Sequence, residues 1–289
     1  MIDLHIHTTN SDGQYTTAEV LKMCEKAELE LISITDHFSV GAYDDLKDPA
    51  VRKFFSGEIL VGCEFPASFK GQTVEVLGYG FKPEDAKEYL SQYPTIAEME
   101  HEEWEHQLQQ YKDRGVLMDA SLIGEGKTSF WNEINRHSEN RMRYRNPQSA
   151  ESAQAFFRKE MSDYRSPFFF DTSWHFPPIK EVVDYIHSLG GIAVLAHPLT
   201  YSDSVIEELE ELIELAKPDG LEVWYSAYDD EQRAHLMTLC EKYRLIFSGG
   251  SDFHNDWRIA WGNALGIPHL AEKFPTEEIL KWVNQCKMI

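Results

Sequence analysis

The chain of 289 residues has few cysteines and no long apolar segment. Its four cysteines, Cys24, Cys63, Cys240 and Cys286, are widely spaced and form no C-x-x-C pair. A disulfide framework or a structural zinc knuckle is therefore not expected, and a reducing compartment fits. No apolar run approaches the ~18 residues that a membrane-spanning helix needs, and Met1 leads directly into an expected strand. We therefore expect a cytoplasmic protein without a membrane partner.

Positive charge is scarce as well. The sequence has 27 Lys and Arg against 49 Asp and Glu, which gives a formal net charge of −22. Long nucleic acid is therefore not an expected partner, because phosphate backbones are held mainly by Lys and Arg. A small phosphorylated substrate is not excluded, because bound metal ions reverse the sign of the charge locally. The hydrophobic content of 42% is typical of a folded globular protein.

Short apolar segments alternate with helical segments in the first third of the sequence and again from residue 178, which predicts an α/β fold. Strands are expected at 2–6, 31–35, 59–62, 74–79, 192–196, 221–224 and 245–248, the fourth of them paired with the run near Phe65. Helices are expected at 16–28, 43–55, 179–189, 204–215, 229–242 and 276–285. Seven or eight such strands would fit a barrel.

The segment 94–167 interrupts this alternation. It is polar and helical in character, with expected helices at 98–114, 131–145 and 149–164 and no convincing parallel strand. We therefore predict a barrel domain made of residues 1–93 and 168–289, with 94–167 as an inserted helical subdomain that acts as a lid. Aromatic residues 168–170 and 174–176 follow the insertion, and they favour packing of the insertion against the barrel over stacking on a base.

Histidines and carboxylates follow the apolar runs at several expected strand ends. The groups are Asp3-Leu4-His5-Ile6-His7, Thr35-Asp36-His37, Gly62-Cys63-Glu64, Ala196-His197-Pro198 and Gly250-Ser251-Asp252-Phe253-His254. Residues i and i+2 of a strand point to the same face, so His5 and His7 can bind one ion together. A single His-x-His is more often an ordinary strand pair. Several such groups together predict a multinuclear metal site, because burying so many ionisable groups without partners is costly.

In these motifs, together with Asp12-Gly13, the chain resembles the PHP family (the polymerase and histidinol phosphatase superfamily). The motifs cover roughly residues 1–80 and 178–270 and occur in the family order. The resemblance implies a distorted (β/α)7 barrel of the PHP type, here with a helical insertion. It also implies a metal-dependent phosphoesterase with up to three metal ions at the carboxyl ends of its strands.

The resemblance assigns ligands position by position. One ion would take His5, His7, Glu64 and Asp252, and a second would take Asp12, His37 and His254. A third would share Glu64 and take His197. Glu75 stands where the family has a histidine, and its harder oxygen favours manganese or iron over zinc at that position. The sequence therefore predicts two or three divalent ions (Mn, Fe or Zn), with Glu64 as the bridging carboxylate.

The predicted reaction is hydrolysis of a small phosphomonoester, with a nucleotide as one candidate, by attack of a metal-bound hydroxide. Asp252 and His197 are candidate proton donors for the leaving oxygen, and Asp36 is expected to orient a ligand. Glu222 and Tyr225 are candidate substrate contacts at the rim. Arg136 and Arg141 would bind the substrate phosphate if the insertion folds over the site. The alternative is that these arginines lie on a solvated helix face and balance an acidic chain.

Several other functions stay open. Histidinol-phosphate phosphatase and short-oligonucleotide exonuclease are alternatives within the family, and hydrolysis of C–N bonds or a non-catalytic, metal-binding regulatory role are alternatives outside it. Related phosphoesterases for small nucleotides carry a Thr-Arg-x-His-like segment in the insertion, of which Asn135-Arg136-His137 is only a loose equivalent. The oligomeric state is not given by the sequence.

Overall fold

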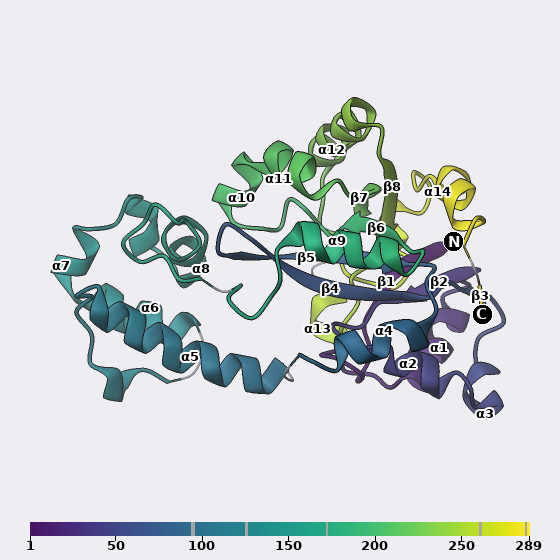
Figure 1. The fold of residues 1–289 in the computed structure, drawn as a ribbon, viewed down its shortest axis with the longest axis horizontal. Coiled ribbons are helices and arrows are strands. Elements are labelled where there is room, and N and C mark those ends of the chain that lie inside the picture. The colour runs from purple at the N-terminus through teal and green to yellow at the C-terminus, as the bar shows by residue number, and fades with distance from the viewer. Residues whose placement is uncertain (94–95, 125–126, 172, 260–261, 287) are drawn as a thin grey trace.

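The computed structural model describes residues 1–93, 96–124, 127–171, 173–259, 262–286 and 288–289, and it shows a mixed α/β fold (Figure 1). The strands are β1 (Ile2–Ile6), β2 (Leu31–Ile34), β3 (Glu58–Ile59), β4 (Gly62–Phe69), β5 (Gln72–Tyr79), β6 (Ile192–Leu195), β7 (Gly220–Tyr225) and β8 (Ile246–Gly250). The helices are α1 (Thr17–Lys26), α2 (Gly41–Asp45), α3 (Pro49–Arg52), α4 (Pro83–Leu90), α5 (Ile96–Asp113), α6 (Lys127–Arg136), α7 (Ser138–Arg141), α8 (Ala153–Phe156), α9 (Ile179–Ser188), α10 (Asp203–Glu207), α11 (Leu209–Ala216), α12 (Asp230–Tyr243), α13 (Asp256–Ile259) and α14 (Thr276–Val283).

The strands form two sheets. A parallel three-stranded sheet has the order β1-β2-β3, and a five-stranded sheet has the order β4-β5-β6-β7-β8. In the second sheet β5 runs antiparallel to both of its neighbours, whereas β6, β7 and β8 are parallel. Isolated backbone bridges, Ile6 to Phe253 and His37 to Glu64, connect the two sheets. These bridges bring the ends of β1 and β2 beside the residues that follow β8 and beside β4.

The α/β class predicted from the sequence is confirmed, but a closed (β/α)7 barrel is not observed. The reason lies in β4 and β5, which are joined by a tight turn at Lys70-Gly71 and not by a helix. Both turn residues have positive φ angles, of 49° and 76°, a conformation that such a hairpin turn requires. A β4–β5 hairpin forces an antiparallel pair into a sheet that a barrel of repeated strand–helix units would make wholly parallel.

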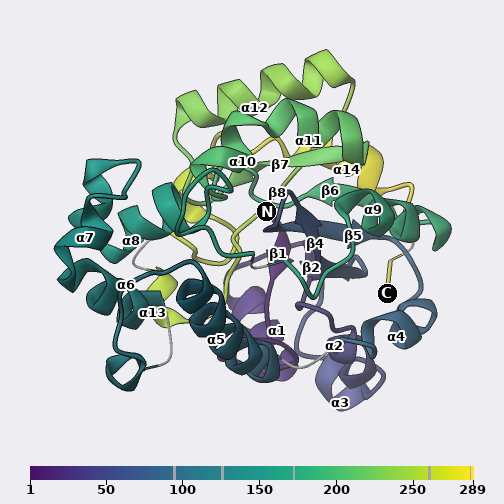
Figure 2. The same cartoon turned by 60° about the vertical axis from the view of Figure 1, so that its left-hand side comes forward.

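Amphipathic helices cover the sheets. Figures 1 and 2 show α10, α11 and α12 on one side of the strands and α1 to α4 on the opposite side. Helix α1 begins at Thr16, whose side chain forms a capping box with Glu19, and it buries Val20, Leu21 and Cys24. The single helix expected at 43–55 is instead divided into α2 and α3, because Asp48 caps a new helix that starts at Pro49.

Residues 96–170 form only helices and turns among the residues that the structure describes. They surround an apolar cluster of their own, which includes Tyr111, Phe130, Ile134, Phe156 and Phe168. Figure 1 shows this part as a lobe beside the sheets, reached through α5. The assignment of 94–167 as an inserted subdomain stays a prediction, and its first two residues lie outside the described ranges. None of the described helices has the length and apolar character that crossing a membrane requires.

Candidate metal centre

The first group of candidate ligands is buried between β1, β4 and the turn after β8. The Nε2 atoms of His5 and His7 lie 3.1 Å apart. Oε2 of Glu64 lies 3.1 Å from His5 Nε2 and 3.2 Å from His7 Nε2. Oδ1 of Asp252 lies 3.4 Å and 3.3 Å from the same two nitrogens. Four side chains from three separate segments therefore converge on one point, as the sequence motifs predicted.

Two further groups adjoin the first. His7, Asp12, His37 and His254 form one of them, with His254 Nε2 3.3 Å from Asp12 Oδ2. Glu75 takes part in the other, together with His37 and Glu64. His197 Nε2 lies 3.1 Å from Glu64 Oε1 and 3.4 Å from Glu75 Oε2, so it also reaches this third group. All nine candidate ligands predicted from the sequence are thus brought together.

The donor atoms fit metal ions in spacing and in charge. Ligand bonds of about 2.1 Å place neighbouring donors roughly 3.0 to 3.4 Å apart in octahedral or tetrahedral geometry. Burial alone would lower the pKa of His7, but hydrogen bonds with Asp252 and Glu64 raise the pKa to about 10. For His197 the hydrogen bond with Glu64 likewise outweighs burial and raises the pKa to about 9. The cluster therefore attracts positive charge strongly, and mixed N and O donors suit divalent ions.

A buried carboxylate outside the ligand groups orients two of their members. Glu222, on β7, is completely buried, and its Oε1 lies 2.9 Å from His5 Nδ1. Its Oε2 accepts a hydrogen bond of 2.8 Å from the backbone N–H of His197. A carboxylate that holds the far nitrogen of a histidine fixes the ring and leaves Nε2 for a metal ion. Glu222 is therefore placed behind the candidate ligands, and its expected contact with substrate stays a prediction.

Asp36 orders the loop that follows β1. Its Oδ1 accepts hydrogen bonds from the Thr8 N–H (2.7 Å) and the Ser11 hydroxyl (2.6 Å), and its Oδ2 accepts one from the Thr8 hydroxyl (2.7 Å). Ser11 Oγ in turn lies 3.5 Å from His7 Nδ1. These hydrogen bonds place Asp36 behind the loop that carries Asp12. That Asp36 orients a ligand stays a prediction; Ser11, which contacts both Asp36 and His7, would connect the two.

Tyr225 and Arg258 approach Asp252 from the open side of the cluster. The Tyr225 hydroxyl donates a hydrogen bond of 2.9 Å to Asp252 Oδ2, and Arg258 Nη1 lies 3.3 Å from the same oxygen. Arg258 Nη1 also lies 2.9 Å from His254 Nδ1. Arg258 was not expected at the site from the sequence, because it lies on the short helix α13, beyond the motif that ends at His254.

The structure does not bring Arg136 and Arg141 to the metal cluster. Arg136 pairs with Glu133 on its own helix at 3.1 Å, and Arg141 donates to the backbone carbonyl of Asn135. Figure 1 places their helices, α6 and α7, at the outer end of the helical lobe. Their expected role as a phosphate clamp over the rim is therefore not met. The solvated-face alternative describes them better, because the lobe packs on its own apolar cluster.

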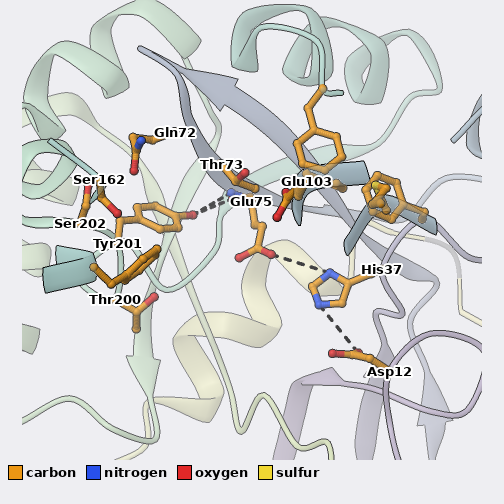
Figure 3. A pocket seen from close by; sticks show the side chains of 15 residues that line it. Asp12, His37, Gln72, Thr73, Glu75, Glu103, Ser162, Thr200, Tyr201 and Ser202 are labelled. Atoms are coloured by element: carbon orange, nitrogen blue, oxygen red, sulfur yellow. Dashed lines mark hydrogen bonds and ion pairs between the residues drawn. The ribbon is translucent and has the colours of Figure 1, made fainter. Parts of the chain in front are cut away.

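Two cavities open onto the candidate ligands. One, of about 350 Å³, is lined by His37, Glu64, Glu75, His197, Thr200, Tyr225, Ala227, Asp252, His254, Trp257, Arg258 and Asn263. The other, of about 500 Å³, shares His37, Glu75 and Thr200 with the first and extends toward the helical lobe (Figure 3). Because they share a wall at the third ligand group, a substrate phosphate at the cluster has room on both sides.

Backbone strain is concentrated at this site. His197 has a φ angle of 26°, Asp252 of 53° and Phe38, next to His37, of 50°. Residues other than glycine rarely adopt positive φ angles, and a surrounding structure that holds them there is typical of functional sites. The strained positions therefore mark the same region as the ligand geometry does.

The clustered donor atoms form a candidate metal centre, and known proteins with similar sequences are phosphoesterases. No family model matches the chain. The chain is 25% identical over 260 residues to a 3',5'-nucleoside bisphosphate phosphatase of Chromobacterium violaceum, covering 88% of this chain and 87% of that protein. It is 24% identical over 256 residues to a 5'-3' exoribonuclease of Haemophilus influenzae, covering 87% and 89%. It is 25% identical over 278 residues to a phosphoribosyl 1,2-cyclic phosphate 1,2-diphosphodiesterase of Eggerthella lenta, covering 94% and 98%.

Solved structures share the fold. An amidohydrolase from Chromobacterium violaceum aligns with a TM-score of 0.60 at 23% identity, covering 92% of this chain and 89% of that one. A protein of Bifidobacterium adolescentis assigned as a metal-dependent phosphoesterase aligns with a TM-score of 0.55 at 23% identity, covering 88% and 87%. The predicted resemblance to PHP-type enzymes is thus confirmed: the chain is similar in sequence to phosphoesterases and shares the fold of a solved protein assigned as a metal-dependent phosphoesterase. The expected exclusion of long nucleic acid is not supported, because exoribonucleases are among the relatives.

Proposed function

We propose that this protein hydrolyses a small phosphomonoester, with a nucleotide as the first candidate, using two or three divalent ions at the cluster. The observation that carries the proposal is the position of the Glu64 carboxylate. Its Oε1 lies 3.1 Å from His197, whereas its Oε2 lies 3.1 Å from His5 and 3.3 Å from His37. Its two oxygens thus face different ligand groups, which is the arrangement of a carboxylate that bridges ions.

The proposed ligand sets follow the three groups. His5, His7, Glu64 and Asp252 would hold one ion, and Asp12, His37 and His254 would hold a second, with His7 close by. Glu64, Glu75 and His197 would hold a third. Glu75 replaces a nitrogen donor with oxygen, so we expect manganese or iron to be preferred there over zinc.

Bound divalent ions supply an acidified water molecule and neutralise charge on the phosphoryl oxygens. The remaining work falls to side chains of this chain. Arg258 lies at the open side of the cluster beside Asp252, where its guanidinium can hold a phosphoryl oxygen. Glu222 keeps the His5 ring in one orientation, and Tyr225 does the same for the Asp252 carboxylate. Protonation of the leaving oxygen falls to His197, Asp252 or water, since both side chains line the cavity.

Release of inorganic phosphate by the manganese-reconstituted protein tests the proposal. The panel contains nucleoside monophosphates, histidinol phosphate and short oligonucleotides, with a chelated sample and Asp252→Ala beside it. Asp113→Ala, which removes an exposed carboxylate at the end of α5, is the matched control. We expect turnover that is lost in the first two samples and kept in the control. Metal binding without phosphate release from any substrate would refute the proposal and favour C–N hydrolysis or a non-catalytic role.

A second candidate, exonuclease activity on short oligonucleotides, is favoured by one specific observation. Three of the relatives are 5'-3' exoribonucleases, and the chain covers most of their length. The same panel separates the two candidates, because an exonuclease releases mononucleotides from oligonucleotides before any inorganic phosphate appears.

A further inference from the structure

The larger cavity, on the side of the helical lobe, has the character of a binding site for the organic part of the substrate. It encloses about 500 Å³ and begins at His37 and Glu75, so that it lies directly beside the candidate metal ligands. Figure 3 shows Thr200, Tyr201 and Ser202 on one side of Glu75 and His37 on the other, with Glu103 above them. A phosphate ester bound at the cluster therefore has space here for its leaving group.

This cavity offers no positive charge to a second phosphate. Among the lining residues that the structure describes there is no Lys or Arg, and Glu103 adds a carboxylate beyond the candidate ligands Asp12 and Glu75. Arg158 and Lys159 lie nearby in the chain, but they line a separate cavity and both pair with Asp203, at 3.1 Å and 2.9 Å. Apart from the ions proposed at the ligand groups, which the first phosphate occupies, a second phosphate group would therefore find no Lys or Arg to offset its repulsion by Glu103.

One wall of the cavity is aromatic. Phe38 and Phe176 both line it, with ring centroids 5.5 Å apart and planes tilted by 32°. Phe38 has a φ angle of 50°, and its N–H donates a hydrogen bond of 3.2 Å to the carbonyl of Glu64. The backbone of Phe38 is thus held by Glu64, whose carboxylate is the proposed bridge between ions. Aromatic walls of this kind bind flat rings by stacking.

The opposite part of the cavity holds a buried hydroxyl that needs a partner. Ser162 is 1% exposed and lines the cavity, and its Oγ has no hydrogen-bond partner in the described chain. Buried polar atoms are nearly always hydrogen-bonded, so an unpartnered one in a binding cavity points to a ligand atom. The ligand therefore combines a flat apolar face with a hydrogen-bonding group.

We propose that this cavity binds an uncharged leaving group that carries an aromatic ring, such as a nucleoside, between the Phe38–Phe176 wall and Ser162. This inference rests on the proposed phosphoesterase function and narrows it. The preferred substrates are monophosphates with a single anionic group, and a second phosphate on the leaving group weakens binding.

Three substrates test the two parts of the inference separately. Adenosine monophosphate carries the ring and one phosphate, ribose 5-phosphate lacks the ring, and adenosine 3',5'-bisphosphate adds a second phosphate. We expect kcat/KM for the monophosphate to exceed that for ribose 5-phosphate by about tenfold, the effect of one stacked base. We expect it to exceed that for the bisphosphate by a similar factor of about ten. Equal or higher kcat/KM for either competitor overturns the inference.

Two substitutions test which residues of the cavity bind the leaving group. Phe38→Leu removes the ring at similar volume, and we expect it to raise KM for adenosine monophosphate by about tenfold, with a smaller effect on ribose 5-phosphate. Ser162→Ala removes the unpartnered hydroxyl, and we expect about a threefold increase in KM. Phe274→Leu and Ser248→Ala are matched controls, because both residues lie outside the two cavities and Ser248 is also buried without a partner.

Adenosine binding separates this inference from the proposed reaction. Calorimetric titration of the wild-type protein with adenosine requires no catalysis, and we expect binding that Phe38→Leu weakens and Phe274→Leu leaves intact. Absence of phosphate release from every ester, with adenosine still bound in this way, refutes the reaction and keeps the binding site. Phosphate release without any binding of adenosine, or with binding that Phe38→Leu leaves unchanged, refutes the binding site and keeps the reaction.

Discussion

Replacing Glu222 with glutamine tests whether the buried carboxylate behind the ligands is needed for metal binding. The substitution keeps the size of the side chain, but it exchanges one acceptor oxygen for an NH2 group. In the wild type both oxygens accept, one from His5 Nδ1 at 2.9 Å and one from the His197 N–H at 2.8 Å. The amide can satisfy only one of them, so a buried donor loses its partner, at a cost of about 1–3 kcal/mol.

If the hydrogen bond with His5 is the one lost, the His5 ring is no longer held in a single orientation. Loss of such a supporting partner weakens metal binding by about 10- to 100-fold in known metal sites. We expect the same decrease when manganese is titrated against a competing chelator. The metal-free variant should also unfold at a lower temperature than the wild type, because the unpaired donor is buried. Glu241→Gln, an exposed change on α12, is the control. A manganese affinity of Glu222→Gln equal to that of the wild type would refute this reasoning.

Three further predictions follow from the cluster. Chelation of the metals should lower the free energy of unfolding by about 2.7 kcal/mol for each ion lost, at a metal concentration 100 times Kd. Thermal unfolding with and without chelator measures this, and an unchanged Tm would contradict it. Glu75→His should shift the metal preference toward zinc, since nitrogen replaces oxygen in the third group. Elemental analysis after loading with mixed metals checks this, and an unchanged ratio of zinc to manganese argues against Glu75 as a ligand. Arg258→Met should lower kcat/KM at least about tenfold, because a charge-assisted hydrogen bond is lost, whereas Arg136→Met should change kcat/KM little. Equal effects of the two substitutions would contradict the placement of Arg258 at the substrate phosphate.

The ligand set could be predicted from the sequence because its members belong to short local motifs. His5 lies on β1 and His7 follows directly after it, whereas Asp252 and His254 both follow β8, so each pair is only two residues apart in one short motif. The structure brings these pairs together with Glu64 and Glu75, although both glutamates lie within strands and not at strand ends. The mixed α/β class followed in the same way from the alternation of apolar strands and amphipathic helices.

The other features of the fold and of the site depend on contacts between distant residues, which short sequence motifs do not encode. The β4–β5 hairpin changes the sheet from parallel to antiparallel, and the Lys70-Gly71 turn that produces it is only two residues long. The arginines of α6 and α7 were recognised as helical, but the direction of those helices is set by the apolar cluster around Phe130 and Phe156. Glu222 was recognised as a strand acid, but its role depends on His5, which lies 217 residues away in the chain.

The number of metal ions bound per chain, measured together with phosphate release, tests the central claim most directly. The purified protein is loaded with manganese, and its metal content and turnover of a nucleoside monophosphate are compared with those of Glu64→Gln. The account predicts two or three ions per chain in the wild type. In Glu64→Gln it predicts at least one ion fewer and turnover that falls with the loss. Full metal content in the variant, or phosphate release that survives removal of every ion, would contradict it.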